Sequence, residues 1–207
     1  MAVGLFGGTF DPIHVGHLRI AEEVREDFGL DWIYFVPASL QPLKRQKNGA
    51  AADDRMRMVR SAIGENGRFR VSAVEMSRGG VSYTIDTVKH FSRRHRDIYF
   101  LLGLDAFRDI GLWKCHEDLF HLVNFVVMGR AGCVEEGLPV GLAKEVQPVD
   151  GRTWAHSSGK RIYLHDSTRI DISSTQVRGL VRKGKSIKYL VPPSVERYIN
   201  KRGLYRD

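Results

Sequence analysis

The chain carries the stretch G-G-T-F-D-P-I-H-V-G-H at residues 7–17, directly after its first apolar run. That run, residues 3–6, is typical of a buried strand, and apolar residues recur at helical spacing from about residue 15 to residue 28. The stretch therefore predicts a strand-to-helix junction, where backbone N–H groups at the start of the helix collect and can hold a phosphate. Its glycines would let a ligand approach the backbone closely.

The alternation of strands and helices continues along the chain. Short apolar runs predict further strands at residues 32–36, 69–74, 98–102, 125–128 and 161–164. Helical spacing and end signals predict a helix capped by Asp53 or Asp54, and others over residues 83–95, 117–123, 173–183 and 194–201. Residues 131–160 carry no pattern that predicts an element.

This order of elements predicts an α/β fold with a doubly wound parallel sheet that is covered by helices on both faces. The ligand site of such a fold lies at the carboxyl ends of its strands. We expect one domain over residues 1–207, with residues 170–207 as a small C-terminal helical part.

The composition restricts the class of protein. The 207 residues are 43% hydrophobic and have a net charge of +8, which favours an anionic partner such as a nucleotide, a nucleic acid or an acidic lipid. No apolar run approaches about 20 residues, so we expect no membrane partner, and the N-terminus does not resemble a signal peptide. The two cysteines form no C-x-x-C pair and suit a reducing, cytoplasmic location. The sequence does not define an oligomeric state.

The basic residues are spread along the chain in four separate clusters. These clusters lie at residues 44–47, 55–60, 93–96 and 178–188. Because no interleaved aromatic residues accompany them, we expect no nucleic-acid partner.

Two histidines of the opening stretch are candidate catalytic residues. His14 and His17 are three residues apart, so they share one face at the start of the predicted helix. The positive end of the helix disfavours their protonation, and neutral imidazoles can donate hydrogen bonds to phosphoryl oxygens. The same pair could bind zinc, but no third ligand is evident nearby, so we expect no metal site built by the protein.

A second glycine-containing stretch matches a known phosphate motif only by its letters. Residues 179–186, G-L-V-R-K-G-K-S, fit the Walker A pattern, whereas no G-x-G occurs anywhere in the chain. A phosphate-binding loop must follow a strand and open a helix. Because these residues continue a helix that begins at Ser173 or Ser174, with Gly184 as a C-cap, we expect no phosphate-binding loop here.

The stretch at residues 7–17 resembles a signature of the nucleotidyltransferases that transfer AMP or CMP from a nucleoside triphosphate, and this implies a Rossmann-like fold of the nucleotidyltransferase type. The stretch I-S-S-T-Q-V-R at residues 172–178 resembles their second signature, where a helix start and an arginine hold the triphosphate. Within that family the chain is similar to the bacterial nicotinate-mononucleotide adenylyltransferases. Further stretches extend the resemblance from Leu5 to Tyr205, and they are residues 82–87, residues 101–105, Trp113 ahead of Leu119, and residues 191–205.

The resemblance implies a role for particular residues. The catalytic group is His14, His17, Lys44 and Arg178. The ATP-binding group is Gly7, Gly8, Thr9, Phe10, Gly16, Gly103, Asp105, Ser173, Ser174 and Thr175. The group that binds the nicotinate nucleotide is Ser39, Tyr83, Thr84 and Trp113. The chain departs from the family pattern P-N-x-x-P-P-H-K at residues 37–44. Lys44 is kept, but Ala38 or Ser39 stands at the asparagine position and Leu43 replaces the histidine.

The reaction that the resemblance implies joins ATP and nicotinate mononucleotide into deamido-NAD and releases pyrophosphate. Mg²⁺ is expected to arrive with ATP and to keep several of its waters. Two alternatives stay open at this point. One is an adenylyltransferase of the same fold that acts on nicotinamide mononucleotide or phosphopantetheine, and the other is a nucleotide or RNA binder without catalytic activity.

Overall fold

A computed structural model describes residues 1–40, 49–129 and 145–206. The chain forms two compact units. The first unit comprises Met1–Gly7, Glu23–Ile33 and Tyr83–Ser167, and the second comprises Gly8–Glu22, Tyr34–Ser82 and Thr168–Asp207. The prediction of one domain over residues 1–207 stays a prediction.

The first unit is built on parallel strands. These are β1 (Ala2–Gly8), β4 (Asp97–Gly103), β5 (Asn124–Gly129) and β8 (Arg161–Asp166), in that spatial order. The register aligns Leu5 with Phe100, Phe100 with Phe125, and Phe125 with Ile162, so one row of buried side chains crosses all four strands. The prediction of a parallel sheet is confirmed for these strands.

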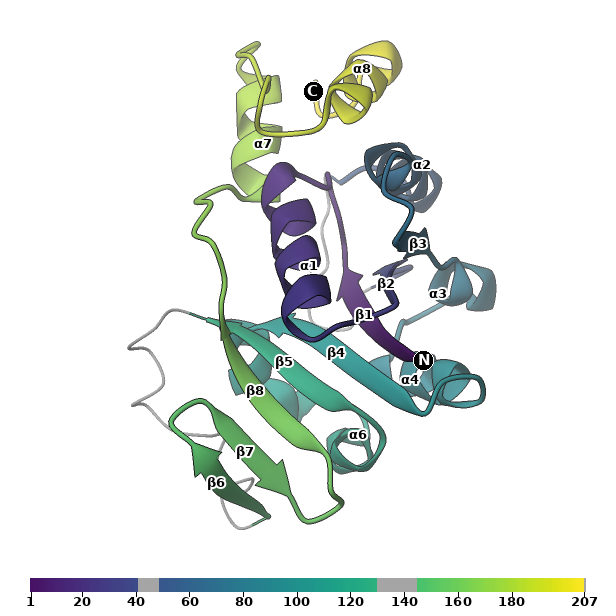
Figure 1. Cartoon of the computed structure of the whole chain (residues 1–207). Helices are drawn as coiled ribbons and strands as arrows, with labels where there is room; N and C mark the ends of the chain where they lie inside the picture. Colours follow the sequence, from purple (N-terminus) through teal and green to yellow (C-terminus); the bar gives the residue numbers. More distant parts are fainter. Residues whose placement is uncertain (41–48, 130–144, 207) are drawn as a thin grey trace. The chain divides into compact units, whose positions relative to one another are not determined.

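An antiparallel pair extends this sheet beyond β8, where the sequence predicted no element. It consists of β7 (Thr153–His156), paired with β8, and β6 (Val146–Asp150), paired with β7 (Figure 1). Four of the five β6 residues are exposed, so the strand carries no apolar run that would identify it. The predicted parallel sheet therefore continues at this edge as an antiparallel pair.

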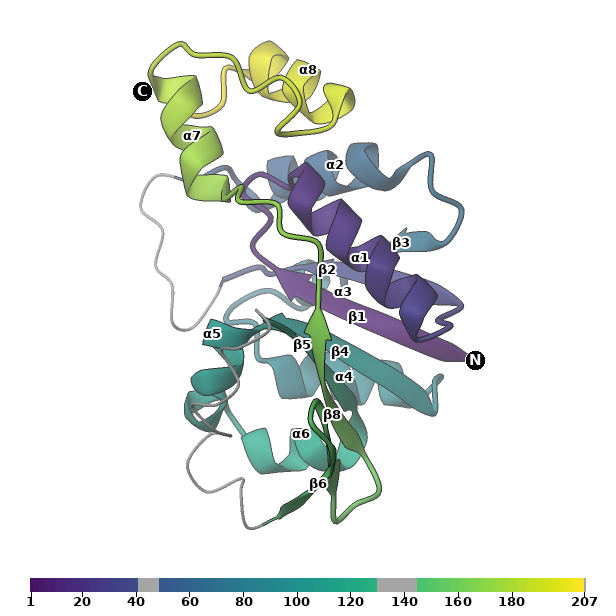
Figure 2. The same cartoon turned by 60° about the vertical axis from the view of Figure 1, so that its left-hand side comes forward.

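Helices cover both faces of the sheet in the first unit. The helical segments are α4 (Thr84–Ser92), α5 (Leu104–Arg108), the 3₁₀ segment η1 (Ile110–Leu112) and α6 (His116–Leu122), and α4 packs beside α6 (Figure 2). Phe120 of α6 packs on Phe125 of the sheet with ring centroids 4.9 Å apart. Successive strand residues face opposite sides, and on the other side Phe28, which follows α1 (Val15–Asp27), contacts Tyr99 and Tyr163.

The second unit holds two neighbouring strands and most of the other helices. Its elements are β2 (Trp32–Pro37), β3 (Phe69–Val71), α2 (Ala52–Ile63), α3 (Val74–Arg78), α7 (Ser174–Arg182) and α8 (Pro193–Arg202). The strand predicted over residues 69–74 ends at Val71, because Val74 begins α3.

The start of α2 also differs from the prediction. The N-cap is Ala51, and neither Asp53 nor Asp54 caps the helix. Asp54 is buried, and its Oδ1 accepts a 2.7 Å hydrogen bond from the hydroxyl of Tyr198 in α8. Its carboxylate therefore ties two helices together.

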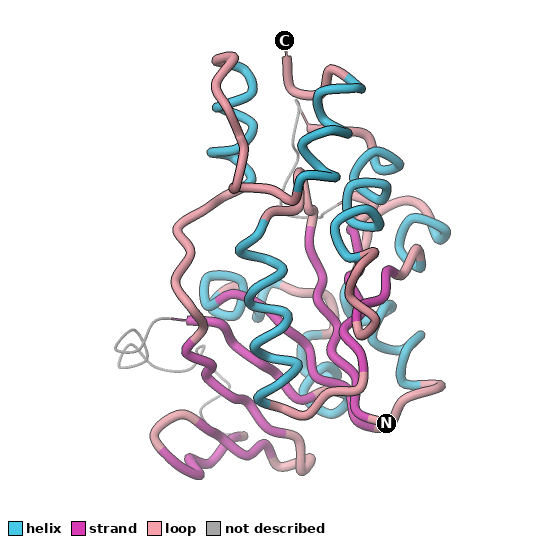
Figure 3. The backbone as a smooth tube through the Cα atoms, turned by 45° about the horizontal axis from the view of Figure 1, so that its top comes forward, coloured by secondary structure: helices cyan, strands magenta, loops and turns pink. Residues whose placement is uncertain are grey.

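The Walker A lookalike lies at the end of α7, as expected. Residues 179–182 are helical, and Gly184 follows in the left-handed conformation with φ of +64°. The N–H groups of Gly184 and Lys185 bond back to Val181 and Leu180, which is a helix end and not a phosphate cradle. The next helix, α8, starts only at Pro193 after a loop (Figure 3). Among the described residues, no helix is long and apolar enough to cross a membrane.

Candidate active site

The two histidines of the opening stretch stack on each other at the N-terminus of α1. Their ring centroids are 3.6 Å apart, and the ring planes differ by 24°. The backbone N–H of His14 donates to Nδ1 of His17 over 3.2 Å, and the backbone N–H of His17 donates to the carbonyl of His14 over 3.0 Å. The expected common face is therefore present, and the backbone holds the pair in place.

Burial keeps both rings neutral. It lowers the pKa of His14 to about 4, and burial followed by the charge of His14 lowers the pKa of His17 well below 6.5. Because Nδ1 of His17 accepts a backbone hydrogen bond, the proton of the neutral ring belongs on Nε2. His17 thus has an N–H donor at neutral pH without carrying a charge.

The glycines around the pair leave room for rings. A Cβ at Gly16 would lie 3.1 Å from Nδ1 of His14, and a Cβ at Gly8 would lie 3.0 Å from the ring of Phe10. That buried ring meets His17 edge-on at a centroid distance of 5.2 Å. The sequence predicted that these glycines let a ligand approach the backbone. In the structure, Gly8 and Gly16 also permit the ring packing that supports the histidines.

The start of α7 is fastened to the loop between β1 and α1. Ser173 caps the helix by accepting a hydrogen bond from the N–H of Gln176 over 3.1 Å. Ser174 donates from its hydroxyl to the carbonyl of Pro12 over 2.8 Å. Arg178 donates from Nη1 to the carbonyl of Asp11 over 2.6 Å and from Nη2 to Oγ1 of Thr175 over 3.2 Å. The second unit therefore brings the two signature stretches together.

A buried carboxylate, Asp11, lies at the centre of this contact and was not predicted as a site residue. Its side chain is 2% exposed, and its Oδ1 accepts hydrogen bonds from the N–H of Ala50 and the hydroxyl of Tyr205. Its Oδ2 is 3.9 Å from Nη1 of Arg178, too far for a hydrogen bond. Burial and Asp11 together raise the pKa of Tyr205, so the phenol stays protonated and donates.

Ser39 lies in a short bridge between two loops of the second unit. Its N–H donates to Oγ of Ser82 over 3.0 Å, and the N–H of Ser82 donates to the carbonyl of Leu40 over 2.9 Å. In the chain, Ser82 directly precedes Tyr83 and Thr84, which were predicted to bind the nicotinate nucleotide. Lys44 lies outside the described residues.

The other residues predicted to bind the nicotinate nucleotide lie in the first unit. Tyr83 is the N-cap of α4, and Thr84 is its first residue. Nζ of Lys114 lies 4.5 Å from the centre of the Tyr83 ring, and the neighbouring Trp113 packs edge-on against Phe100. Lys114 belongs to none of the motifs, so the sequence did not predict that it lies beside Tyr83.

The predicted nucleotide residues of the first unit lie at the carboxyl ends of two neighbouring parallel strands. Gly7 is near the end of β1, and Gly103 is the last residue of β4. Asp105 follows in the first turn of α5 with a fully exposed side chain. This placement is the one expected for a ligand site of the fold class.

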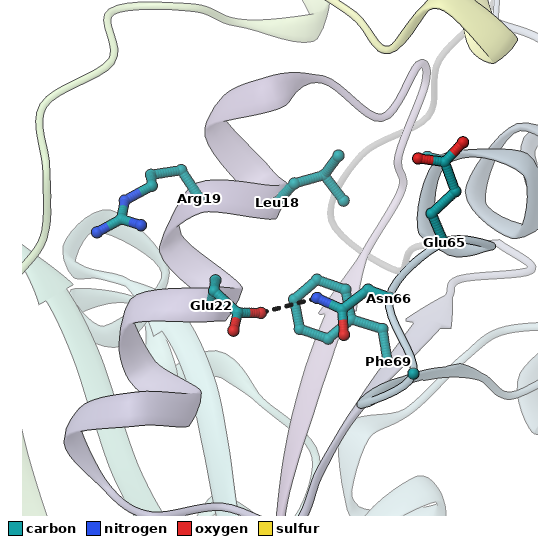
Figure 4. A pocket seen from close by; sticks show the side chains of 8 residues that line it. Leu18, Arg19, Glu22, Glu65, Asn66 and Phe69 are labelled. Atoms are coloured by element: carbon teal, nitrogen blue, oxygen red, sulfur yellow. Dashed lines mark hydrogen bonds between the residues drawn. The ribbon is translucent and has the colours of Figure 1, made fainter.

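A groove of about 510 Å³ lies elsewhere in the second unit (Figure 4). It is lined by α1, by the end of α2 and by the segment that follows α2, and Asn66 donates to Glu22 across it over 2.8 Å (Figure 4). None of the predicted site residues lines it. Within the described part of the chain, no three His, Cys, Asp or Glu side chains are grouped so that they could hold a metal ion.

Comparison with known proteins defines the class. The cytidylyltransferase-like family matches residues 5–180, and the chain belongs to this family. Two relatives that match over their full length are each named "probable nicotinate-nucleotide adenylyltransferase". The protein of Geotalea uraniireducens (strain Rf4) is 45% identical, covering 100% of this chain and 99% of the relative. The protein of Desulfatibacillum aliphaticivorans is 42% identical, covering 99% of this chain and 100% of the relative. Within its family the chain therefore groups with the nicotinate-nucleotide adenylyltransferases.

A solved structure agrees with this fold. The nicotinic acid mononucleotide adenylyltransferase of Plasmodium falciparum, complexed with NaAD, matches with a TM-score of 0.73 at 22% identity. The match covers 99% of this chain and 97% of that chain. The predicted Rossmann-like nucleotidyltransferase fold is confirmed.

Proposed function

We propose that this chain transfers the adenylyl group of ATP to nicotinate mononucleotide, which gives deamido-NAD and pyrophosphate. The observation that carries the proposal is the stacked neutral pair His14 and His17 at a helix N-terminus, in a chain whose full-length relatives are named for this reaction. A cytoplasmic location and the contact of Lys44 with substrate remain predictions of the same proposal.

The chemistry requires positioning and charge stabilisation. A phosphate oxygen of the acceptor attacks the α-phosphorus of ATP, and the bond from that phosphorus to the oxygen bridging the β-phosphorus breaks. Pyrophosphate leaves with the bonding electron pair. Because the attacking oxygen is already ionised at pH 7, no general base is needed, and the protein's contribution is alignment and electrostatics.

The histidine pair supplies donors aimed at developing negative charge. Nε2–H of His17 is fixed by the backbone bond to Nδ1, so the donor is preorganised before charge develops. Nδ1 of His14 is buried and makes no hydrogen bond with the described residues. A buried ring nitrogen of this kind calls for a partner, and a phosphoryl or amide group of the nucleotide would provide one.

Positive charge in the second unit supports triphosphate binding. Arg178 faces the same loop from α7, and the exposed cations Arg182, Lys183, Lys185 and Lys188 follow in the same unit. Such a field raises the local concentration of an anionic substrate. We propose that Mg²⁺ enters as part of the MgATP substrate, since Mg²⁺ commonly binds through substrate phosphates and retains waters.

The acceptor residues of the first unit favour an acid over an amide. The first N–H groups of α4, at Thr84 and Ile85, have no partner within the helix and carry the positive end of its dipole. A carboxylate only accepts hydrogen bonds, so it suits these donors better than a carboxamide does. The amine of Lys114 adds a positive charge beside Tyr83, and Trp113 offers a flat face for a pyridine ring.

The test is pyrophosphate release from ATP with each acceptor offered separately. We expect nicotinate mononucleotide to exceed nicotinamide mononucleotide by at least about tenfold in kcat/KM, because an unpaired buried polar group costs about 1–3 kcal/mol. Equal rates, or faster turnover of the amide or of phosphopantetheine, would overturn the acceptor and leave adenylyl transfer in place. RNA binding with a steep salt dependence and no pyrophosphate release would overturn the reaction itself.

A further inference from the structure

Arg55, in the first turn of α2, is a buried arginine. Its hydrogen bonds to the described residues all go to backbone carbonyl oxygens. Its residue exposure is 5%. Nη1 donates to the carbonyl of Thr9 over 2.8 Å and to that of Ala38 over 2.7 Å. Nη2 donates to the carbonyl of Ser39 over 3.1 Å, and Nε donates to that of Ala50 over 3.3 Å. Four of the five N–H groups of a guanidinium are thereby used.

These carbonyls belong to segments with different expected tasks. Thr9 lies in the stretch predicted to bind ATP, and Ser39 was predicted to contact the nicotinate nucleotide. The third segment, at Ala50, is held from its other side, because its N–H donates to Oδ1 of Asp11 over 3.0 Å. One guanidinium therefore fixes the spacing between the ATP stretch and the loop after β2.

We propose that Arg55 is a positioning residue that sets the binding geometry for both substrates at once, through the backbone of Thr9 and of Ala38–Ser39. The inference rests on the proposed function for the identity of the substrates. Arginine is required because its planar fork presents donors in several directions, whereas the ammonium of lysine is a single point on a flexible stem. Asp11 compensates part of the cost of burying the charge, since it opposes the lowering of the Arg55 pKa by burial.

The variants that test this role are Arg55→Met, Arg55→Lys and the matched control Arg57→Met, which removes an exposed arginine two positions along the same helix. Each protein is assayed well below its unfolding temperature, with KM for ATP, KM for nicotinate mononucleotide and kcat measured separately. We expect Arg55→Met to raise both KM values and to lower kcat/KM by about a hundredfold. Arg55→Lys keeps the charge and should still lose about tenfold, while Arg57→Met should stay within about twofold of the wild type.

A merely structural role has a different signature. If Arg55 only stabilised the fold, the folded molecules would keep both KM values, and kcat would fall in proportion to the unfolded fraction measured by circular dichroism. That result, or a rise in only one of the two KM values, would overturn the proposal. If Arg55→Met does not fold, Arg55→Lys decides by the same criteria.

The failure of the proposed function would be visible in the wild type. A wild-type protein that releases no pyrophosphate with nicotinate mononucleotide contradicts the reaction and not the role of Arg55. In that case ATP binding is measured by calorimetry on the same variants. Loss of ATP affinity of at least about tenfold in Arg55→Met, but not in Arg57→Met, would support the positioning role, and equal affinities would overturn it.

Discussion

Tyr205 donates its hydroxyl hydrogen to Oδ1 of Asp11 over 2.6 Å, although the two residues are 194 positions apart in the chain. Both side chains are buried. The contact joins the segment after α8 to the stretch that contains the histidine pair. The last turn of the structure therefore helps to fix the first loop.

We expect Tyr205→Phe to lower the free energy of unfolding by about 1–3 kcal/mol, because it removes a hydrogen bond from a buried carboxylate and leaves the ring in place. Urea denaturation measures the difference. Tyr189→Phe is the control, since the Tyr189 residue is 80% exposed and the change should have no measurable effect. A loss in Tyr205→Phe as small as in the control would show that the contact contributes nothing.

Substitution of His17 should affect turnover more than binding. We expect His17→Ala to lower kcat about a hundredfold while the Kd of ATP changes little, because a preorganised donor acts mainly on charge that develops in the transition state. Rapid kinetics and calorimetry separate the two quantities. His90→Ala removes an exposed histidine of α4 and should leave both unchanged. Near-normal kcat in His17→Ala would exclude His17 from the mechanism.

The buried neutral His14 makes stability fall as the solution becomes acidic. Below pH 6.5 the unfolded chain binds a proton at His14 that the folded chain does not accept until the pH reaches about 4. Stability is therefore complete above the unfolded pKa and decreases through this window, by about 2 kcal/mol for His14 between pH 7 and pH 5. Urea denaturation at both pH values should show a smaller decrease in His14→Gln than in the wild type. An identical decrease in both proteins would contradict the burial of the ring.

Gly103 offers a way to separate ligand contact from stability. A Cβ at this position meets no heavy atom of the described residues within 4 Å. We therefore expect Gly103→Ala to leave the free energy of unfolding within about 0.5 kcal/mol of the wild type and to raise KM for ATP several-fold. Gly8→Ala, which presses on the ring of Phe10, should instead destabilise the fold by about 1–3 kcal/mol. An unchanged KM in Gly103→Ala would remove Gly103 from the nucleotide site.

Lys114 should contribute to the choice between acid and amide acceptors. We expect Lys114→Met to reduce the ratio of kcat/KM values for nicotinate and nicotinamide mononucleotides by about threefold, as is usual for an exposed charge. Lys89→Met is the control, because Lys89 pairs with Asp118 on the surface of the same unit. If both variants change the ratio equally, the effect comes from the net charge of the protein and not from the position of Lys114 beside Tyr83.

Consecutive buried residues made the central strands of the sheet predictable from the sequence. The central strands β4 and β5 each contain three consecutive buried residues, so their apolar runs are continuous and readable. Strand β6 is mostly exposed, and α3 has only five residues, so neither leaves a periodic pattern. The cap expected at Asp53 or Asp54 is absent, since the N-cap is Ala51 and Asp54 accepts a hydrogen bond from the hydroxyl of Tyr198 instead.

The candidate site was predictable where motifs are local. The spacing of His14 and His17 on a helix predicts their common face without further information. The link between Asp11 and Tyr205 depends on chain folding over nearly the whole sequence, and no spacing rule describes it. Arg55 was grouped with Arg57 and Arg60 as part of a basic cluster, because a charge pattern does not tell a buried guanidinium from solvated ones.

The contacts of Arg55 have a consequence for how this protein can diverge or be redesigned. The guanidinium binds carbonyl oxygens, which every amino acid possesses, so it places few demands on the side chains at Ala38 and Ser39. The amino-acid sequence of the loop after β2 can thus change while its backbone path is kept. This chain already differs from the family pattern in that loop. Because Ala38 is buried, a library that randomises Ser39 and keeps Ala38 and Arg55 should retain folded members and explore new acceptors. In the same library without Arg55, the backbone path of this loop would no longer be held by the guanidinium, and fewer members should fold.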